Sequence, residues 1–128
     1  MGYPNDRKYS TDHEWVLVDG NVATVGISHH AQDALGEIVH VELPAVGKVF
    51  KKGDSAAEVE SVKAVSDVYA PVSGTVAAVN SGLEGNEGTV NSDPHEAGWL
   101  FKLTLSKPAE VDALLDSAAY GDHAGNDF

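Results

Sequence analysis

Apolar and polar residues alternate over short stretches of this chain, and turn-forming residues separate these stretches. Glu14–Val18 and Asn21–Ile27 alternate on either side of Asp19-Gly20, which predicts a β-hairpin closed by a two-residue turn. The same alternation predicts further strands at residues 37–43, 49–50, 75–80 and 100–105. In the first of these, alternate apolar residues should share one side of the strand: Val39, Val41 and Leu43. Many short strands with frequent turns are typical of a β-sandwich or a β-barrel.

Two segments have helical spacing instead. Ser28 can cap a short internal helix that ends near Leu35, and Gly36 is a suitable stop for it. Residues 108–120 predict a C-terminal helix that begins at a proline. Its apolar residues recur at helical spacing: Val111, Leu114, Leu115 and Ala118. Residues 121–128 should then form a tail.

One short motif occurs twice. Pro44–Val49 and Pro71–Val76 both read Pro-x-x-Gly-x-Val. Two copies of one turn-and-strand unit predict two small sheets related by an approximate twofold axis.

Between the two copies, Lys63 lies in the segment EVESVKAVSDVYAP. β-branched residues precede and follow it, which predicts two strands that meet at a tight turn with the lysine at its tip. It is the only Lys or Arg between Lys52 and Lys102, and eight carboxylates share that stretch: Asp54, Glu58, Glu60, Asp67, Glu84, Glu87, Asp93 and Glu96. An enzyme can reach a lysine at a rigid tip, and the amine is a nucleophile once deprotonated. This position suits a lysine that is acylated and used as a tether; the alternative is an exposed hairpin lysine without a role.

Composition limits the partners. The chain has 128 residues, enough for one domain. Eight basic and twenty acidic residues give a net charge of −12. This charge disfavours binding to nucleic acid or anionic membranes and favours binding to basic patches on other proteins. There is no cysteine, and no apolar run approaches the length of a bilayer span. The N-terminus, MGYPNDRKYS, has no apolar or Arg-rich leader, so a bacterial cytoplasmic location is expected. The chain is also expected to be a monomer.

Several blocks of residues occur in a characteristic order between about residues 9 and 105. They are Tyr9, His13-Glu14-Trp15, Gly26-Ile27-Ser28, Ala31-Gln32, Leu35-Gly36, Val39, Val41, Leu43-Pro44, Val46-Gly47, Glu60-Ser61-Val62-Lys63-Ala64, Ser66-Asp67, Tyr69, Pro71, Ser73-Gly74, Val76, Asn80, Asn91, Pro94 and Gly98-Trp99. With Lys63 on a hairpin, this ordered set resembles the H-protein family of the glycine cleavage system. The resemblance implies one lipoyl-carrier domain over residues 1–128, with its core at about 9–105. The implied fold is mainly β: a barrel-sandwich hybrid of two small sheets, like lipoyl and biotinyl domains, with a short internal helix and a C-terminal helix.

The resemblance implies a carrier subunit without catalytic residues. Lys63 would carry lipoic acid as N6-lipoyllysine, attached by a lipoate ligase or an octanoyltransferase. The arm would take the aminomethyl group of glycine at the P protein, a pyridoxal-phosphate glycine decarboxylase. It would deliver this group to the T protein, an aminomethyltransferase that uses tetrahydrofolate, and the L protein, a flavin dihydrolipoyl dehydrogenase, would reoxidise it. The redox sulfurs would then belong to the cofactor, in agreement with a chain that has no cysteine.

Three carboxylates are candidates for contacts with the loaded arm. An aminomethyl group on the arm carries a cationic amine, and folding it against the protein would require carboxylates nearby. Glu14 and Asp67 lie in the blocks that carry the resemblance, and Asp12 is the third candidate.

Four residues around the lysine are candidates for recognition by the ligase or by partner proteins: Glu60, Ser61, Val62 and Ala64. Ser61 and Ala64 are small and should keep the turn tight and accessible.

Other signals point to no further chemistry. The six histidines do not have metal-ligand spacing, so no metal site is expected. No P-loop or GxSxG motif is present, and no nucleophile, base and oxyanion site occur together.

Two departures from the family pattern, and two other functions, remain open. Glu87-Gly88-Thr89-Val90 replaces a segment that usually begins with proline, and His95 replaces the usual tyrosine. One alternative is an H-like protein that acts mainly as a lipoyl donor or relay. The other is a lipoyl or biotinyl module of a larger multienzyme chain, such as a 2-oxoacid dehydrogenase. Biotinyl domains favour methionine beside the lysine, and acyltransferase lipoyl modules usually have aspartate before it, whereas Val62 and Ala64 flank Lys63 here.

Overall fold

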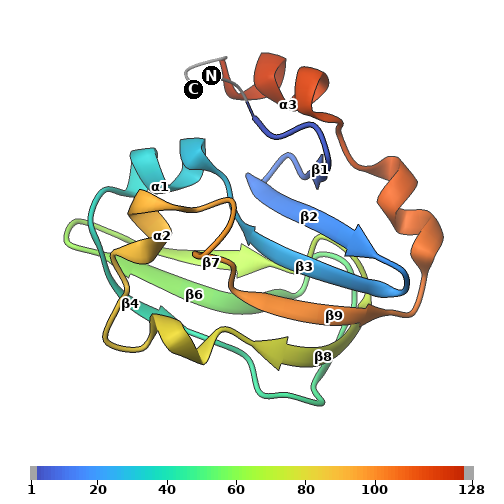
Figure 1. Cartoon of the computed structure of the whole chain (residues 1–128), viewed down its shortest axis with the longest axis horizontal. Helices are drawn as coiled ribbons and strands as arrows, with labels where there is room; N and C mark the ends of the chain where they lie inside the picture. Colours follow the sequence, from blue (N-terminus) through green and yellow to red (C-terminus); the bar gives the residue numbers. More distant parts are fainter. Residues whose placement is uncertain (1–2, 126–128) are drawn as a thin grey trace.

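The computed structural model describes residues 3–125, which form two antiparallel sheets and several short helices (Figure 1). The six-stranded sheet has the order β1-β2-β3-β9-β8-β5. Its strands are β1 (Lys8–Tyr9), β2 (Glu14–Asp19), β3 (Val22–Ile27), β5 (Val49–Phe50), β8 (Gly74–Val79) and β9 (Phe101–Leu105). The three-stranded sheet, β4-β6-β7, consists of β4 (Ile38–Glu42), β6 (Ser55–Ser61) and β7 (Val65–Tyr69). The predicted mainly β architecture of two sheets is confirmed.

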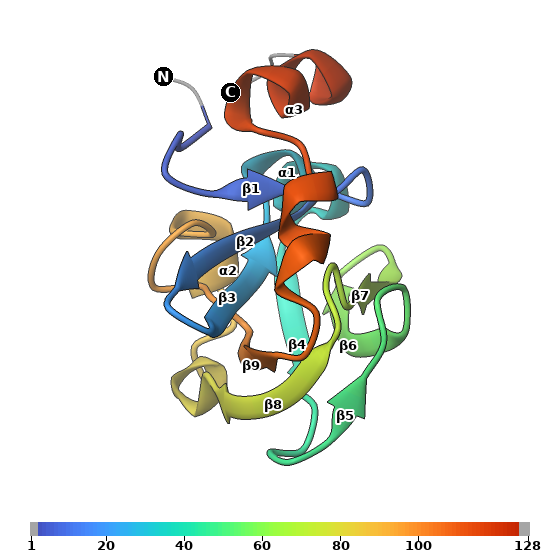
Figure 2. The same ribbon diagram turned by 90° about the vertical axis from the view of Figure 1, so that its right-hand side faces the viewer.

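The core lies between the two sheets, which Figure 2 shows beside one another in a side view. Val25 and Leu103 of the larger sheet belong to the same fully buried cluster as Val59 of the smaller one. Successive residues of a strand point to opposite faces, so the period of two in the sequence provides this cluster. No helix in residues 3–125 is both long enough and apolar enough to cross a bilayer.

The two copies of the Pro-x-x-Gly-x-Val motif lie side by side. The amide of Gly47 donates to the carbonyl of Val76, and the amide of Val76 donates to the carbonyl of Lys48, each at 2.8 Å. Strands β5 and β8 are therefore antiparallel neighbours within the six-stranded sheet, so the two copies lie in one sheet and do not form two separate sheets as predicted.

The short internal helix forms as predicted. Helix α1 (His29–Leu35) is capped by Ser28, whose Oγ accepts the amide of Ala31 at 3.2 Å. Gly36 ends the helix with a φ of 86°, a conformation that glycine adopts without strain.

Two strand predictions need correction. The first hairpin turns at Gly20-Asn21 and not at Asp19-Gly20, because Asp19 pairs with Val22. In β4 a register shift between Ile38 and His40 breaks the alternation, so Val39 is 45% exposed while Ile38 is buried. A bulge of this kind reverses the faces of the residues beyond it.

The predicted C-terminal helix over 108–120 is wrong in its continuity and its end. Residues 108–113 form a 3-10 helix, η2 (Pro108–Ala113), and a separate helix, α3 (Ser117–Ala124), extends into the predicted tail. The two are separated because Leu115 exchanges two backbone hydrogen bonds of 2.8 Å with Tyr9, which requires an extended backbone. Ala118 is exposed and does not face the core as its spacing suggested. Residues 126–128 of the expected tail lie outside the described part of the chain.

Helix α3 packs on the end of the larger sheet through aromatic residues. The rings of Tyr9 and Tyr120 stack with their centroids 4.6 Å apart. The hydroxyl of Tyr120 lies 2.6 Å from Ser28 Oγ and 2.7 Å from His13 Nδ1. The C-terminal segment therefore contacts the residue that caps α1.

Candidate functional site

Lys63 lies at the tip of the β6–β7 hairpin, as the sequence predicts. Figure 1 shows this turn at the end of the smaller sheet, beside α1 and α2 (Thr89–Ser92). The amide of Ser61 donates to the carbonyl of Ala64 at 2.7 Å and closes the turn. Ser61 is buried, whereas Val62, Lys63 and Ala64 are exposed.

The side chain of Ser61 satisfies the polar groups of the turn. Its Oγ lies 3.3 Å from the amide of Lys63 and 3.0 Å from the amide of Ala64, both of which point to it as donors. The same Oγ lies 3.2 Å from the carbonyl of Ala64 and can donate to it. A hydroxyl that binds nearby backbone groups stabilises a tight turn. The backbone beneath the lysine is therefore fixed while the side chain projects outward.

The turn also rests on the segment that links α1 to β4. The amide of Val62 donates to the carbonyl of Glu37 at 3.0 Å. A Cβ added to Gly36 would lie 3.4 Å from Cε of Lys63, so the methylenes of the lysine lie over this glycine. A Cβ at this distance would make an ordinary van der Waals contact, so the requirement for glycine at position 36 comes from its positive φ of 86°.

Glu14 lies at the other end of β7. It is 2% exposed, and its carboxylate accepts hydrogen bonds from Ser10 Oγ at 2.5 Å and from the amide of Tyr69 at 3.4 Å. Burial raises the pKa of the Glu14 carboxyl to about 7; the negative charge of Asp12 adds to the rise, and the two hydrogen bonds oppose it. Four residue steps along β7, about 13 Å at about 3.3 Å per step, separate Tyr69 from Val65 beside the turn.

The other two arm-contact candidates are exposed. Asp12 shares a partner with Glu14, because its amide donates to Ser10 Oγ at 3.2 Å. Asp67 precedes Tyr69 by two residues on β7 and accepts a hydrogen bond of 3.1 Å from Ser55 Oγ. Glu14 and Asp12 thus share Ser10 near the end of β7 remote from Lys63, whereas Asp67 is the middle residue of that strand.

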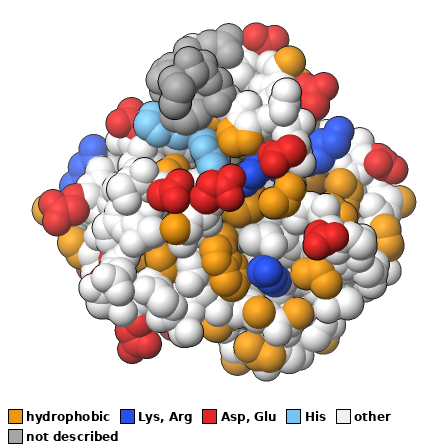
Figure 3. Space-filling view, viewed as in Figure 1, with side chains coloured by type: hydrophobic (Ala, Val, Ile, Leu, Met, Phe, Trp, Pro, Cys, Tyr) orange, Lys and Arg blue, Asp and Glu red, His pale blue; other side chains and the backbone are white. Residues whose placement is uncertain are grey.

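The recognition candidate Glu60 belongs to an acidic face of the smaller sheet. It pairs with His40 on one side and with Val65 on the other. The next row across the same three strands consists of three carboxylates: Glu42, Glu58 and Asp67. Figure 3 shows that acidic side chains also predominate over Lys and Arg on the face seen in Figure 1.

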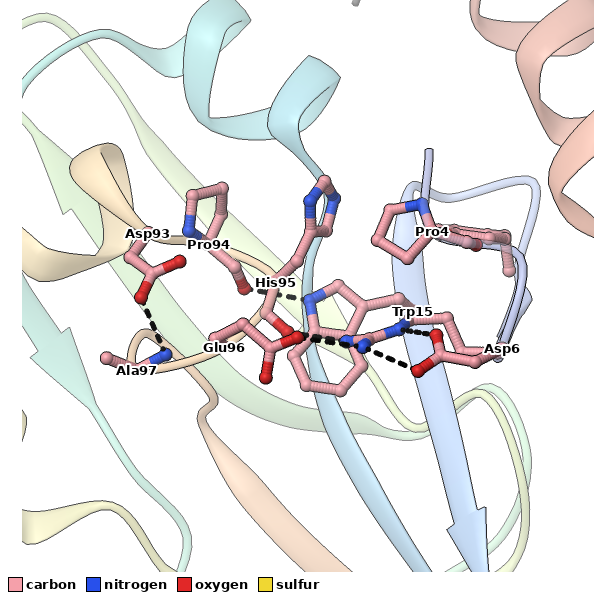
Figure 4. Close-up of polar contacts among 10 residues, drawn as sticks. Pro4, Asp6, Trp15, Asp93, Pro94, His95, Glu96 and Ala97 are labelled. Atoms are coloured by element: carbon pink, nitrogen blue, oxygen red, sulfur yellow. Dashed lines mark hydrogen bonds and ion pairs between the residues drawn. The ribbon is translucent and has the colours of Figure 1, made fainter. Parts of the chain in front are cut away.

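A buried cation connects the N-terminal segment to the loop after α2 (Figure 4). Arg7 is 5% exposed and donates to Asp6 at 2.8 Å, to Glu96 at 3.1 Å and to the carbonyl of His95 at 2.5 Å. Its guanidinium lies 4.8 Å from the ring centre of Trp15, whose Nε1 donates to the carbonyl of Pro94 at 2.9 Å. These contacts fix the loop in which the sequence departs from the family pattern.

His95, one of these departures, has a structural partner. Its Nε2 accepts the amide of His29 in the first turn of α1 at 3.2 Å. Burial lowers the pKa of His95 to about 4, and the positive charge of Arg7 lowers it further. The neutral ring is the form that can accept this bond.

The structure also brings together histidines that are distant in sequence. The ring of His13 lies 4.5 Å from that of His30 and 5.3 Å from that of His123, measured between centroids. Over residues 3–125, no group of three or more His, Cys, Asp or Glu side chains is arranged to hold a metal ion.

The sequence pattern did not indicate two residues that lie next to the site. Gly36 was expected to end α1 and, like Asn91, to belong to the family-like blocks, but neither was a candidate site residue. Both act through contacts with segments tens of residues away, which no local periodicity reports. For Gly36, the only sequence signal was a glycine directly after the predicted helix.

Residues 7–126 match the family model described as Glycine cleavage H-protein. A glycine cleavage system H protein of Laribacter hongkongensis is 56% identical over 123 residues, covering 95% of this chain and 97% of the relative. One of Xanthobacter autotrophicus is 59% identical over 115 residues, covering 90% and 92%. The crystal structure of a glycine cleavage system H protein from Mycobacterium marinum has a TM-score of 0.87 and 39% identity, covering 95% of this chain and 98% of that one. This match confirms the predicted barrel-sandwich hybrid fold, and the chain belongs to the glycine cleavage H-protein family.

Proposed function

We propose that this chain is the lipoyl carrier of a glycine cleavage system and that Lys63 is its attachment point. The observation that carries the proposal is the exposed lysine at the tip of a hydrogen-bonded turn, in a chain of this family. Lys63 and its neighbours Val62 and Ala64 are exposed, which makes the amine accessible to a modifying enzyme. These features fit a covalently attached lipoic acid. Family membership implies partners in a multienzyme system.

The attached lipoic acid would supply a disulfide that accepts the aminomethyl group derived from glycine. The protein supplies a fixed base for the arm, because the turn is held by Ser61 and by the carbonyl of Glu37. Tethering raises the concentration of the reactive group at each docked partner. Acylation also removes the charge of Lys63, which makes the surrounding surface more acidic.

The partners in this proposal are the P, T and L proteins and a lipoate ligase or octanoyltransferase. The acidic face at Glu60 and the row beyond it would bind basic patches on these proteins, with Val62 and Ala64 next to the reacting amine. Association driven by such charges slows as salt concentration rises. A non-catalytic role and a bacterial cytoplasmic location remain part of the proposal.

Glu14 would act at the far end of β7, together with Asp67 and Asp12. A cationic amine brought there would meet a carboxyl whose pKa is about 7, and an opposite charge favours its ionised form. The carboxylate would then hold the amine against the protein and away from water. A longer lifetime of the loaded arm in the wild type than in Glu14→Gln would support this role, and equal lifetimes would reject it.

The attachment proposal is tested by incubating the apo-protein with a lipoate ligase, ATP and lipoate. Intact mass should rise by one lipoyl amide, and peptide mapping should locate it at Lys63. Lys63→Arg should not gain this mass, whereas Lys52→Arg, a control on another turn, should gain it in full. Modification at another lysine would reject the assignment.

The carrier role is separated from that of a lipoyl donor by adding glycine and a glycine decarboxylase. A carrier should gain the mass of an aminomethyl group plus one hydrogen on the modified peptide, because the disulfide would open to one sulfur that carries the group and one thiol. A lipoylated protein that is not loaded under these conditions would favour the relay function.

A further inference from the structure

The side chain of Asn91 joins three backbone and side-chain groups beneath the lysine turn. Its Nδ2 donates to the carbonyl of Gly36 at 2.8 Å and to Gln32 Oε1 at 3.0 Å. Its Oδ1 accepts the amide of Ile38 at 2.8 Å. Asn91 is half-buried on α2, more than 50 residues from these partners in sequence. Donor and acceptor atoms of the amide are therefore both engaged.

Two of these partners, Gly36 and Ile38, enclose Glu37, and this three-residue segment contacts the lysine turn. Gly36 lies under the methylenes of Lys63, and the carbonyl of Glu37 accepts the amide of Val62. Asn91 binds the residue on each side of Glu37, at Gly36 and Ile38. These two hydrogen bonds restrain the peptide groups on both sides of Glu37. The carbonyl of Glu37 therefore keeps its direction toward the amide of Val62.

We propose that Asn91 is a positioning residue for the modification of Lys63, acting through Gly36, Glu37 and Ile38. The inference rests on the proposed attachment at Lys63. Without the amide, the link between α1 and β4 can rotate, and the carbonyl of Glu37 no longer points steadily at the turn. If the modifying enzyme binds only the ordered turn, then only the fraction of apo-protein molecules with an ordered turn can bind it. Its apparent affinity for the apo-protein falls by that fraction, whereas the rate of the bound complex does not.

The test uses two variants and a matched control. Asn91→Ala removes all three hydrogen bonds. Asn91→Asp keeps an acceptor for Ile38 but places a carboxylate oxygen opposite the carbonyl of Gly36. The control is Asn86→Ala: Asn86 lies in the loop before α2, is exposed, and donates to the carbonyl of Gly82 at 3.2 Å.

The first measurement is amide hydrogen exchange of Val62 in the apo-protein. Loss of a hydrogen bond worth about 1 kcal/mol corresponds to roughly a fivefold to tenfold faster exchange. We expect this acceleration in Asn91→Ala, a smaller one in Asn91→Asp and none in Asn86→Ala. This readout needs no cofactor.

The second measurement is the rate of lipoyl attachment at 25 °C, where circular dichroism confirms that each variant is folded. We expect KM for the apo-protein to rise in Asn91→Ala with kcat unchanged, by no more than the factor of about five that a shift of about 1 kcal/mol allows. An unchanged KM together with unchanged Val62 exchange would overturn the inference, as would a fall in kcat alone. If Asn91→Ala does not fold, Asn91→Asp decides by the same two readouts.

The two proposals fail differently. A wild-type protein that no ligase modifies at Lys63 rejects the attachment proposal. The exchange of Val62 still decides whether Asn91 orders the turn.

Discussion

Replacing Glu14 with glutamine should change how the stability of the protein depends on pH. Burial raises the pKa of this carboxyl from 4.5 to about 7. Between these pH values the unfolded chain releases the proton while the folded chain retains it. Stability contributed by this group therefore falls as pH rises through that window. At about 1.4 kcal/mol per pH unit, the full loss is about 3 kcal/mol by pH 8.

Glutamine is uncharged at every pH and has nearly the same shape. Its carbonyl can accept the amide of Tyr69, and its amide group can meet Ser10 Oγ, the two present partners of Glu14. We expect the variant to match the wild type at pH 4 and to exceed its stability by up to about 3 kcal/mol at pH 8. The measurement is urea denaturation of both proteins at several pH values.

The informative quantity is the difference in unfolding free energy between wild type and Glu14→Gln at each pH. His95 makes the stability of both proteins change with pH in the opposite direction. Its pKa falls from 6.5 to about 4, so the unfolded chain binds more protons between these values. Stability contributed by His95 therefore rises with pH over an overlapping window. Subtracting one curve from the other removes this contribution. A difference that stays constant from pH 4 to pH 8 would refute the burial argument for Glu14.

Three further substitutions test the packing and the turn. Gly26→Ala would place a Cβ 2.6 Å from the buried ring of Trp15, and we expect a loss of about 1–3 kcal/mol, seen as a lower Tm; an unchanged Tm would contradict the close approach. Ser61→Ala removes the hydroxyl that binds the turn amides, so the amide of Lys63 should exchange faster, by roughly fivefold to tenfold; equal exchange would show that the turn does not need it. His95→Gln should flatten the rise of stability between pH 4 and 6.5 in urea denaturation, and a preserved rise would assign it to another group.

Much of the fold follows from local pattern. The alternation of residues 14–27, the capping serine at 28 and the glycine at 36 each specify a local structure that packing does not override. Two predictions were wrong for a non-local reason. A bulge opposite β6 turns Val39 outward, and pairing between Leu115 and Tyr9, more than 100 residues apart, interrupts the C-terminal helix. Helical spacing cannot report a competing strand partner.

The candidate site divides in the same way. Lys63 was predicted because β-branched residues flank it in a hairpin pattern, and its exposure agrees with that reading. Glu14 was named for its charge, yet the feature that distinguishes it is burial, which depends on β7 and on Ser10. Asn91 has no local signal for its contacts, because its partners lie on α1 and at the start of β4.

The geometry of β7 connects these two ends of the site. At the turn, the lysine side chain projects from a backbone fixed by hydrogen bonds, so its base moves little while its end is free. At Tyr69, a buried carboxyl is half-ionised near neutral pH and is therefore a weak counter-charge until a cation approaches. In the proposed arm contact, a cation there would stabilise the carboxylate and lower its pKa, and by linkage it would be held more tightly as pH rises through about 7. A permanently ionised, exposed aspartate at the same place would attract the cation at any pH, but with a charge that water screens. In the proposed arm contact, burial of Glu14 would thus make the attraction depend on pH and on the presence of the cation, with less screening by water than at an exposed aspartate.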